Sequence, residues 1–149
     1  MLSALFSFLH FLAVFGIVAT LAIEWATLSA TPTHREARRL QVCDRWYGLF
    51  ATTILVVGFL RVYYFEKGSA YYFANAFFHA KIGLFIVIGL LSIYPTIRFI
   101  RWRRQMAGGQ APTVTQAEYR TLRAVLSLEL LLVTGMVLCA ALMARGFGA

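Results

Sequence analysis

Apolar residues gather in four long runs along the chain, and short polar stretches separate these runs. The runs cover residues 2–30, 44–65, 71–97 and 122–143. Each run has about the 20 residues, or more, that a helix needs to cross the hydrocarbon core of a bilayer. We therefore predict an all-α fold, an integral membrane four-helix bundle that forms one domain over residues 1–149.

The first run is interrupted only by His10 and Glu24. At about 1.5 Å per residue, a helix over this run is roughly 40 Å long, which exceeds the thickness of the hydrocarbon core. No basic stretch precedes it. We therefore expect a retained helix and not a cleaved signal peptide.

The connection before the fourth run contains residues that favour a loop and then a helix start. Gly108, Gly109 and Pro112 break helical structure. Thr115 followed by Glu118 has the spacing of a capping box. The pattern predicts a short amphipathic lead-in to the fourth helix.

Composition agrees with a membrane protein. Hydrophobic residues make up 60% of the chain and charged residues 13%, whereas soluble domains are about half apolar and about a quarter charged. The net charge is +8, but the basic residues lie in short clusters between the apolar runs and no nucleic-acid recognition motif accompanies them. We therefore exclude nucleic acid as a partner and expect the lipid bilayer.

The basic residues also predict an orientation. The second connection contributes only Arg61 and Lys67, and no basic side chain precedes the first run. The first and third connections and their edges carry Arg35, Arg38, Arg39 and Arg45, and Arg98, Arg101, Arg103, Arg104, Arg120 and Arg123. Because cytoplasmic loops carry an excess of Lys and Arg, we expect both termini outside the bacterial inner membrane.

This orientation sorts the polar residues of the runs into two layers. The outer layer contains His10, Arg61, His79 and Lys81, and the inner layer contains Glu24, Asp44, Arg45, Arg123 and Glu129. An intramembrane charge costs on the order of 3 kcal/mol, so such residues face the bundle interior or find partners. For Glu24 and Glu129 we favour ion pairs with the cytoplasmic arginines, and a proton relay is the alternative.

Helical geometry limits which outer residues share a pocket. His10 and Glu24 point within roughly 40° of each other, whereas His79 and Lys81 are separated by about 200° around their helix. If Lys81 faces the core, then His79 faces lipid, a partner subunit or the edge of the pocket. His10 and Lys81 are the expected functional pair because they lie at matched depth on parallel helices.

These residues suit a haem b, since neutral imidazole is an axial ligand of haem iron. His10 is the expected ligand on one side. His79 or Lys81 supplies the second, or that position is open, and Arg61 pairs with a propionate. The methionines form no cluster for Cu(I). Cys43 and Cys139 have no metal-binding spacing, and we expect two reduced packing thiols.

Three stretches carry a family resemblance: LHFLAVFG, DRWYGLFATTILVVGFLRV and FFHAKIGLFIVIGLLSIYPTIRFIRWRR. They resemble a family of small bacterial inner-membrane proteins of unknown function over nearly the whole chain. More distantly, the chain is similar to HemJ-type protoporphyrinogen oxidases and to the membrane domain of copper-resistance protein D. The HemJ resemblance implies haem b binding, with an essential histidine at His10 and a functional lysine at Lys81.

We therefore expect a haem b-binding redox protein of HemJ-like type in the bacterial inner membrane. One alternative is a non-enzymatic accessory subunit of a respiratory or photosynthetic complex, and another is a small proton-coupled transporter. A lone four-helix chain exposes much packing surface, so we expect a homo-oligomer or a place in a larger membrane complex.

Overall fold

The structure, a computed structural model, describes residues 1–65 and 75–147, except for the side chain of Phe65. It contains four long helices, α1 (Leu2–Thr27), α2 (His34–Leu60), α4 (Ala76–Gln105) and α5 (Gln116–Ala144), and two short ones, the π-helix η1 (Arg61–Phe65) and the 3₁₀-helix η2 (Met106–Gly108). No strand occurs in the described residues, so the predicted all-α fold is confirmed. Each long helix is long and apolar enough to cross a membrane.

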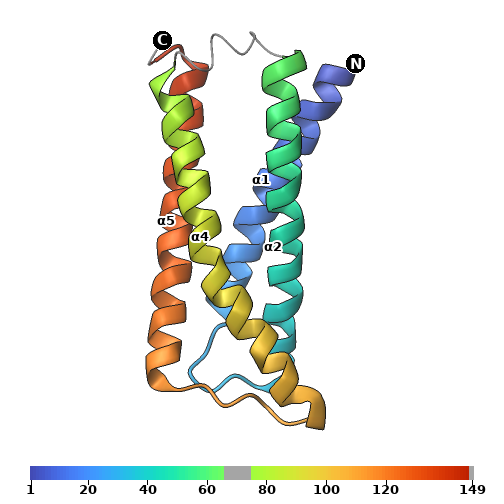
Figure 1. Cartoon of the computed structure of the whole chain (residues 1–149), viewed down its shortest axis with the longest axis vertical. Coiled ribbons are helices and arrows are strands. Elements are labelled where there is room, and N and C mark those ends of the chain that lie inside the picture. The colour runs from blue at the N-terminus through green and yellow to red at the C-terminus, as the bar shows by residue number, and fades with distance from the viewer. Residues whose placement is uncertain (66–74, 148–149) are drawn as a thin grey trace.

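The four helices form two antiparallel hairpins, α1 with α2 and α4 with α5 (Figure 1). Both termini lie at one end of the bundle, which we call the outer end. The connections 28–33 and 106–115 lie at the opposite, inner end. From the outer end, where it runs beside α5, α4 leans across the bundle toward α2 at the inner end (Figure 1).

The helix α2 begins at His34, ten residues before the predicted start at residue 44. Its first turn is stabilised by a capping box: the Thr33 hydroxyl accepts from the Glu36 N–H at 3.2 Å, and the Glu36 carboxylate accepts from the Thr33 N–H at 2.7 Å. The prediction was wrong because hydropathy marks where a helix enters lipid, whereas caps and helix-forming polar residues decide where it starts.

The helix α4 begins at Ala76, directly after its buried cap residue Asn75. The Asn75 Oδ1 accepts from the N–H of Phe77 at 2.9 Å, and its Nδ2 donates to the carbonyl of Phe147 at 3.1 Å. Residues 71–74 of the predicted third segment lie outside the described residues. At its other end α4 continues to Gln105, well beyond the predicted end at residue 97.

The helix α5 begins at Gln116, where the Thr115 hydroxyl accepts from the Glu118 N–H at 3.2 Å. The expected lead-in and the predicted segment 122–143 are therefore one continuous helix. This cap replaces one of the hydrogen bonds that the first turn of a helix lacks.

On α1 and α5, the first and last helices of the chain, the buried residues recur at helical spacing. On α1 they include Ala13, Ile17, Leu21 and Glu24, and on α5 they are Leu122, Leu126, Glu129 and Val133. Glu24 and Glu129 thus occupy core positions and do not reach toward the polar ends of the helices. Close packing accompanies this core, since a Cβ at Gly16 would lie 2.5 Å from the ring of Phe50 on α2.

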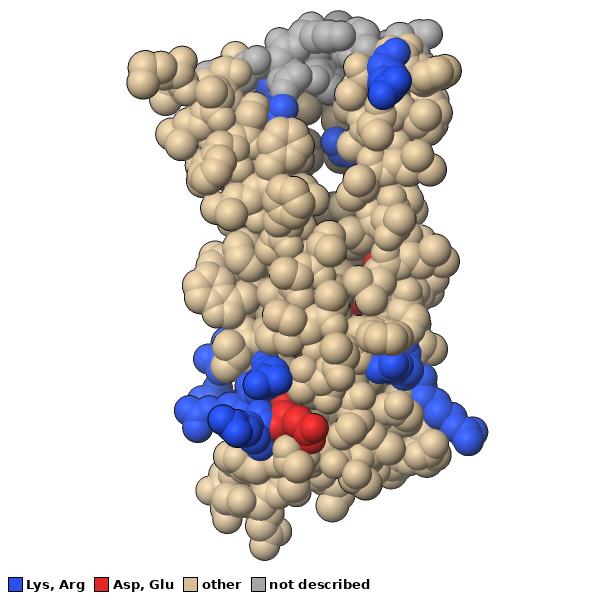
Figure 2. Space-filling view, turned by 180° about the vertical axis from the view of Figure 1, so that it is seen from behind, with Lys and Arg blue, Asp and Glu red and all other residues tan. Residues whose placement is uncertain are grey.

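Charged residues and uncharged surface lie in separate zones of the face shown in Figure 2. Lys and Arg side chains gather at the inner end, a few lie at the outer end, and the face between them is almost free of charge. Such a band is the surface that a lipid bilayer covers.

Candidate functional site

Three carboxyl groups from three helices meet in the inner half of the bundle. Glu24 of α1 lies close enough to Asp44 of α2 and Glu129 of α5 for electrostatic interaction with both. Glu129 is 0% exposed, Glu24 is 2% exposed and Asp44 is half-buried. We call these three residues the carboxyl layer.

The remaining long helix, α4, reaches this layer through hydroxyl groups. Thr96 of α4 donates a hydrogen bond of 2.6 Å from its Oγ1 to the Asp44 carboxylate. It follows the buried Pro95, which lacks the N–H of a regular helical residue. Buried Tyr47, one helical turn after Asp44, lies near Glu129 and near Ser92 of α4, whose hydroxyl donates to the Gly89 carbonyl at 2.8 Å. All four helices therefore contribute to one polar cluster.

The carboxyl groups of Glu24 and Glu129 are poorly satisfied. Within the described part of the chain, Oε1 of Glu24 and both carboxylate oxygens of Glu129 are buried and have no hydrogen-bond partner. An ionised carboxylate without a partner is very costly in such surroundings. The arrangement suits groups that hold a proton inside the bundle.

The expected ion pairs between these carboxyl groups and the arginines are not formed in the described residues, so that prediction was wrong. The Arg123 guanidinium donates to the carbonyl of Trp25 and lies 3.7 Å from the centroid of its ring. Trp25 in turn donates from Nε1 to the Ser127 hydroxyl at 2.9 Å. Arg45 is exposed on the surface of α2, and its Nε donates to the carbonyl of Gln41 at 3.3 Å.

A small cavity lies beside the carboxyl layer. Its volume is about 40 Å³, and residues of all four helices line it, among them Ile17, Tyr47, Ser92 and Val133. A cavity of this volume exceeds the roughly 10–15 Å³ that one water molecule needs, but a bound water also needs polar partners. Tyr47 and Ser92 supply the polar side chains of the lining, and the other lining side chains are apolar.

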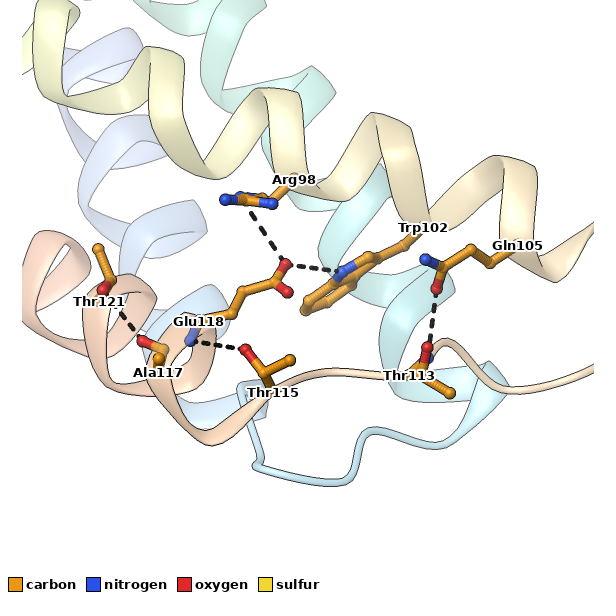
Figure 3. Close-up of polar contacts among 8 residues, drawn as sticks. All are labelled: Arg98, Trp102, Gln105, Thr113, Thr115, Ala117, Glu118 and Thr121. Carbon is orange, nitrogen blue, oxygen red and sulfur yellow. Dashed lines mark hydrogen bonds and ion pairs between the residues drawn. The ribbon is translucent and has the colours of Figure 1, made fainter.

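Polar contacts join the helices between the carboxyl layer and the inner end. Gln41 of α2 donates to the carbonyl of Phe99 of α4 at 3.0 Å. In Figure 3, buried Trp102 donates to the Glu118 carboxylate of α5 at 3.2 Å, and Arg98 lies 3.9 Å from the same oxygen. These contacts link α2, α4 and α5 on the inner side of the layer.

The predicted outer residues are divided between the two hairpins. Half-buried His10 of α1 packs beside Gly58 of α2. A Cβ added at Gly58 would lie 3.7 Å from the Cε1 of His10. Half-buried Arg61 lies 5.9 Å from the ring centroid of Phe11. On α4, Lys81 is half-buried and His79 is exposed, in agreement with their separation around the helix.

The small cavity beside the carboxyl layer does not fit a haem. Pockets for small molecules and cofactors are roughly 300–1,000 Å³, whereas this cavity is about 40 Å³. Its lining does not include His10, Arg61, His79 or Lys81. No group of three or more His, Cys, Asp or Glu side chains in residues 1–65 and 75–147 is placed to hold a metal ion. Haem b binding by His10 stays a prediction.

Sequence reasoning identified the two buried glutamates but missed the hydroxyl groups of Tyr47 and Thr96 near the carboxyl layer. Tyr47 follows Asp44 by three residues, the spacing that puts two side chains on one helix face. That spacing was the available signal for Tyr47. Nothing in the sequence indicated that Thr96 would reach Asp44, because the contact depends on how α4 crosses α2.

The fold and the apolar band define a multi-pass membrane protein of four helices. The chain belongs to the DUF2214 family of predicted membrane proteins, which matches residues 2–148. No curated protein and no solved structure matches the chain. The uncharacterised membrane family is thus established, whereas the resemblance to HemJ and to copper-resistance protein D stays a prediction.

Proposed function

We propose that this protein is a small proton-coupled transporter in which Glu24 and Glu129 take up and release protons. The observation that carries the proposal is the burial of both carboxyl groups, 2% and 0% exposed, at core positions of α1 and α5 without an arginine partner. Ionisable groups inside a membrane bundle are costly, and proton relays are among the functions that retain them.

The proximity of the carboxyl groups supports exchange of protons within the layer. Glu24 interacts with both Asp44 and Glu129, so removing a proton from one makes a second removal harder. Coupled acids of this kind bind and release protons as a group. Asp44 is held by Thr96 and is the least buried of the three, which makes it the suitable entry point for protons.

The hydroxyl groups and the cavity supply the other half of a path. Tyr47 is near Glu129 and near Ser92, and Tyr47 and Ser92 both line the cavity of about 40 Å³. A hydroxyl group both donates and accepts a hydrogen bond. In this proposal a proton leaving Glu129 passes toward the outer half by way of the Tyr47 and Ser92 hydroxyl groups.

The same proposal places the arginine-rich inner end in the cytoplasm and both termini outside a bacterial inner membrane. The exposed apolar faces of the helices then contact lipid or further copies of the chain. Association into a homo-oligomer supplies the wider pathway that a transported solute needs.

A haem b-binding redox protein of the HemJ type is the second candidate. Half-buried His10 and half-buried Arg61, which lies near the adjacent Phe11, favour it. They place an imidazole and a guanidinium at one level of the α1–α2 hairpin, as an axial ligand and a propionate partner would require. Protein purified after haem supplementation and lacking a Soret band would eliminate this candidate.

Proton uptake into proteoliposomes tests the first proposal. A potassium gradient with valinomycin drives protons inward, and a pH-sensitive dye inside the vesicles reports their arrival. We expect Glu24→Gln and Glu129→Gln to abolish uptake, and His10→Ala to leave it unchanged. Glu36→Gln is the matched control, because its capping box accepts glutamine. Equal uptake by Glu129→Gln and the unaltered protein would refute the proposal.

A further inference from the structure

We propose that the inner half of α2 carries a binding site for an anionic phospholipid, which we call the α2 groove. The groove is lined by Val42, Arg45, Trp46 and Leu49 and has a volume of about 290 Å³. In this proposal Arg45 binds the phosphate of the headgroup, and an acyl chain lies along Trp46 and Leu49. The site is separate from the carboxyl layer and does not depend on the proposed transport.

The four residues lie on one face of α2, which the rest of the described chain leaves uncovered. They follow the helical spacing i, i+3, i+4 and i+7. Val42 is 41% exposed, Trp46 52% and Leu49 53%. The Trp46 ring lies against Phe50, with 5.9 Å between the ring centroids, which holds the indole at one side of the groove.

The charge of the groove suits a phosphate. The Arg45 Nε donates to the carbonyl of Gln41 at 3.3 Å, which orients the guanidinium along the helix surface. The neighbouring carboxylate of Asp44 is bound by Thr96 and also attracts Arg45. Exposed Arg38 lies on the same face of α2, seven residues before Arg45 in sequence. The planar fork of an arginine matches phosphate oxygens and binds them with two parallel hydrogen bonds.

The order of residues along α2 favours a lipid over other occupants. From the inner end outward, the face presents Arg38, Val42, Arg45 and Trp46, and then Leu49. Arg45 and Trp46 thus lie between the arginine-rich inner end and the apolar part of α2, where headgroup and interface meet hydrocarbon. A second copy of the chain would need about 800 Å² of buried surface on each partner, which four residues on one helix do not supply.

Native mass spectrometry of the full chain tests the site. Detergent-solubilised protein is mixed with phosphatidylglycerol or phosphatidylcholine, and the fraction that retains lipid is measured. We expect preferential retention of phosphatidylglycerol and a loss of about tenfold in affinity in Arg45→Gln, the effect of removing one charge-assisted contact. Arg45→Lys should retain part of the preference. Arg120→Gln, which changes another exposed arginine near the inner end, should match the unaltered protein.

Three outcomes would overturn the proposal. The first is equal retention of the two lipids, and the second is unchanged retention in an Arg45→Gln variant that circular dichroism shows to be folded. The third is a dimer mass that disappears in Trp46→Ala, which would assign the groove to a second copy. Excess glycerol phosphate should not displace the lipid, because it lacks the acyl chain that contacts Trp46 and Leu49.

Discussion

The carboxyl group of Glu24 near the inner end of α1 lies within electrostatic reach of the carboxyl group of Glu129 in the middle of α5, and both are buried. Exposed Ile23 and Trp25 flank Glu24 in sequence, and exposed Leu128 precedes Glu129. Two acids held together without a basic partner favour proton binding over ion pairing. The predictions below follow from this relationship and from the contacts that fix it.

Replacement of Glu129 by leucine should raise the stability of the protein and abolish its proton uptake. Both Glu129 oxygens lack a hydrogen-bond partner in the described residues, so an apolar side chain should raise the free energy of unfolding by about 1–3 kcal/mol. Thermal unfolding in detergent measures this change. Proton uptake by the same variant should be lost. A destabilised Glu129→Leu variant would instead indicate a structural role for the carboxyl group.

Loss of the Thr96 hydroxyl should weaken the contact between α2 and α4. Thr96→Val leaves an oxygen of Asp44 without its donor at 2.6 Å, and we expect a loss of about 1–3 kcal/mol in the free energy of unfolding. Thr134→Val is the matched control, since Thr134 donates only to the Leu130 carbonyl within its own helix. Equal effects of the two substitutions would argue against a special role for the Asp44–Thr96 bond.

A side chain at Gly16 should disturb the α1–α2 hairpin. A Cβ at this position would lie 2.5 Å from the ring of Phe50, and we expect Gly16→Ala to lower stability by about 1–3 kcal/mol. Gly83→Ala is the control because, apart from the adjacent residues and backbone of its own helix, no atom lies within 4 Å of its Cβ position. Adding Phe50→Leu should restore much of the loss, whereas additive losses in the double variant would contradict direct contact.

The inner contacts should limit access to Cys43, which is buried near Glu24. Gln41→Ala removes the bond to the Phe99 carbonyl, so we expect faster labelling of Cys43 by a membrane-permeant maleimide. The labelling is measured in a Cys139→Ser background, so that only one thiol reacts. Gln110→Ala, which alters an exposed residue of the 106–115 connection, should leave the rate unchanged. An unchanged rate in Gln41→Ala would show that this bond does not close the inner end.

The number and type of helices were predictable because the bilayer imposes a simple requirement. Every backbone polar group inside it must be paired within the segment, so long apolar runs form helices. The helix ends were not predictable in this way. Thr33 and Asn75 set the starts of α2 and α4 through side-chain hydrogen bonds, and neither residue stands out in the hydropathy pattern.

The sequence predicted the depth of the candidate-site residues in the bundle, but not the direction in which their side chains point. The sequence places Glu24, Glu129 and several arginines at a similar level, which led to the prediction of ion pairs. The structure turns Arg123 onto Trp25 and Arg45 onto the surface. The direction of a long side chain depends on tertiary packing, and no spacing rule along one helix reveals it. The functional pairing of His10 with Lys81 stays a prediction.

Infrared difference spectroscopy of the membrane-reconstituted protein tests the central claim most directly. The C=O stretch of a protonated carboxyl group is distinct from the carboxylate bands, and it shifts in D₂O. We predict such a band at neutral pH in the unaltered protein and in Glu36→Gln, with part of its intensity lost in Glu24→Gln and part in Glu129→Gln. A spectrum in which the unaltered protein shows only carboxylate bands at neutral pH would contradict the account.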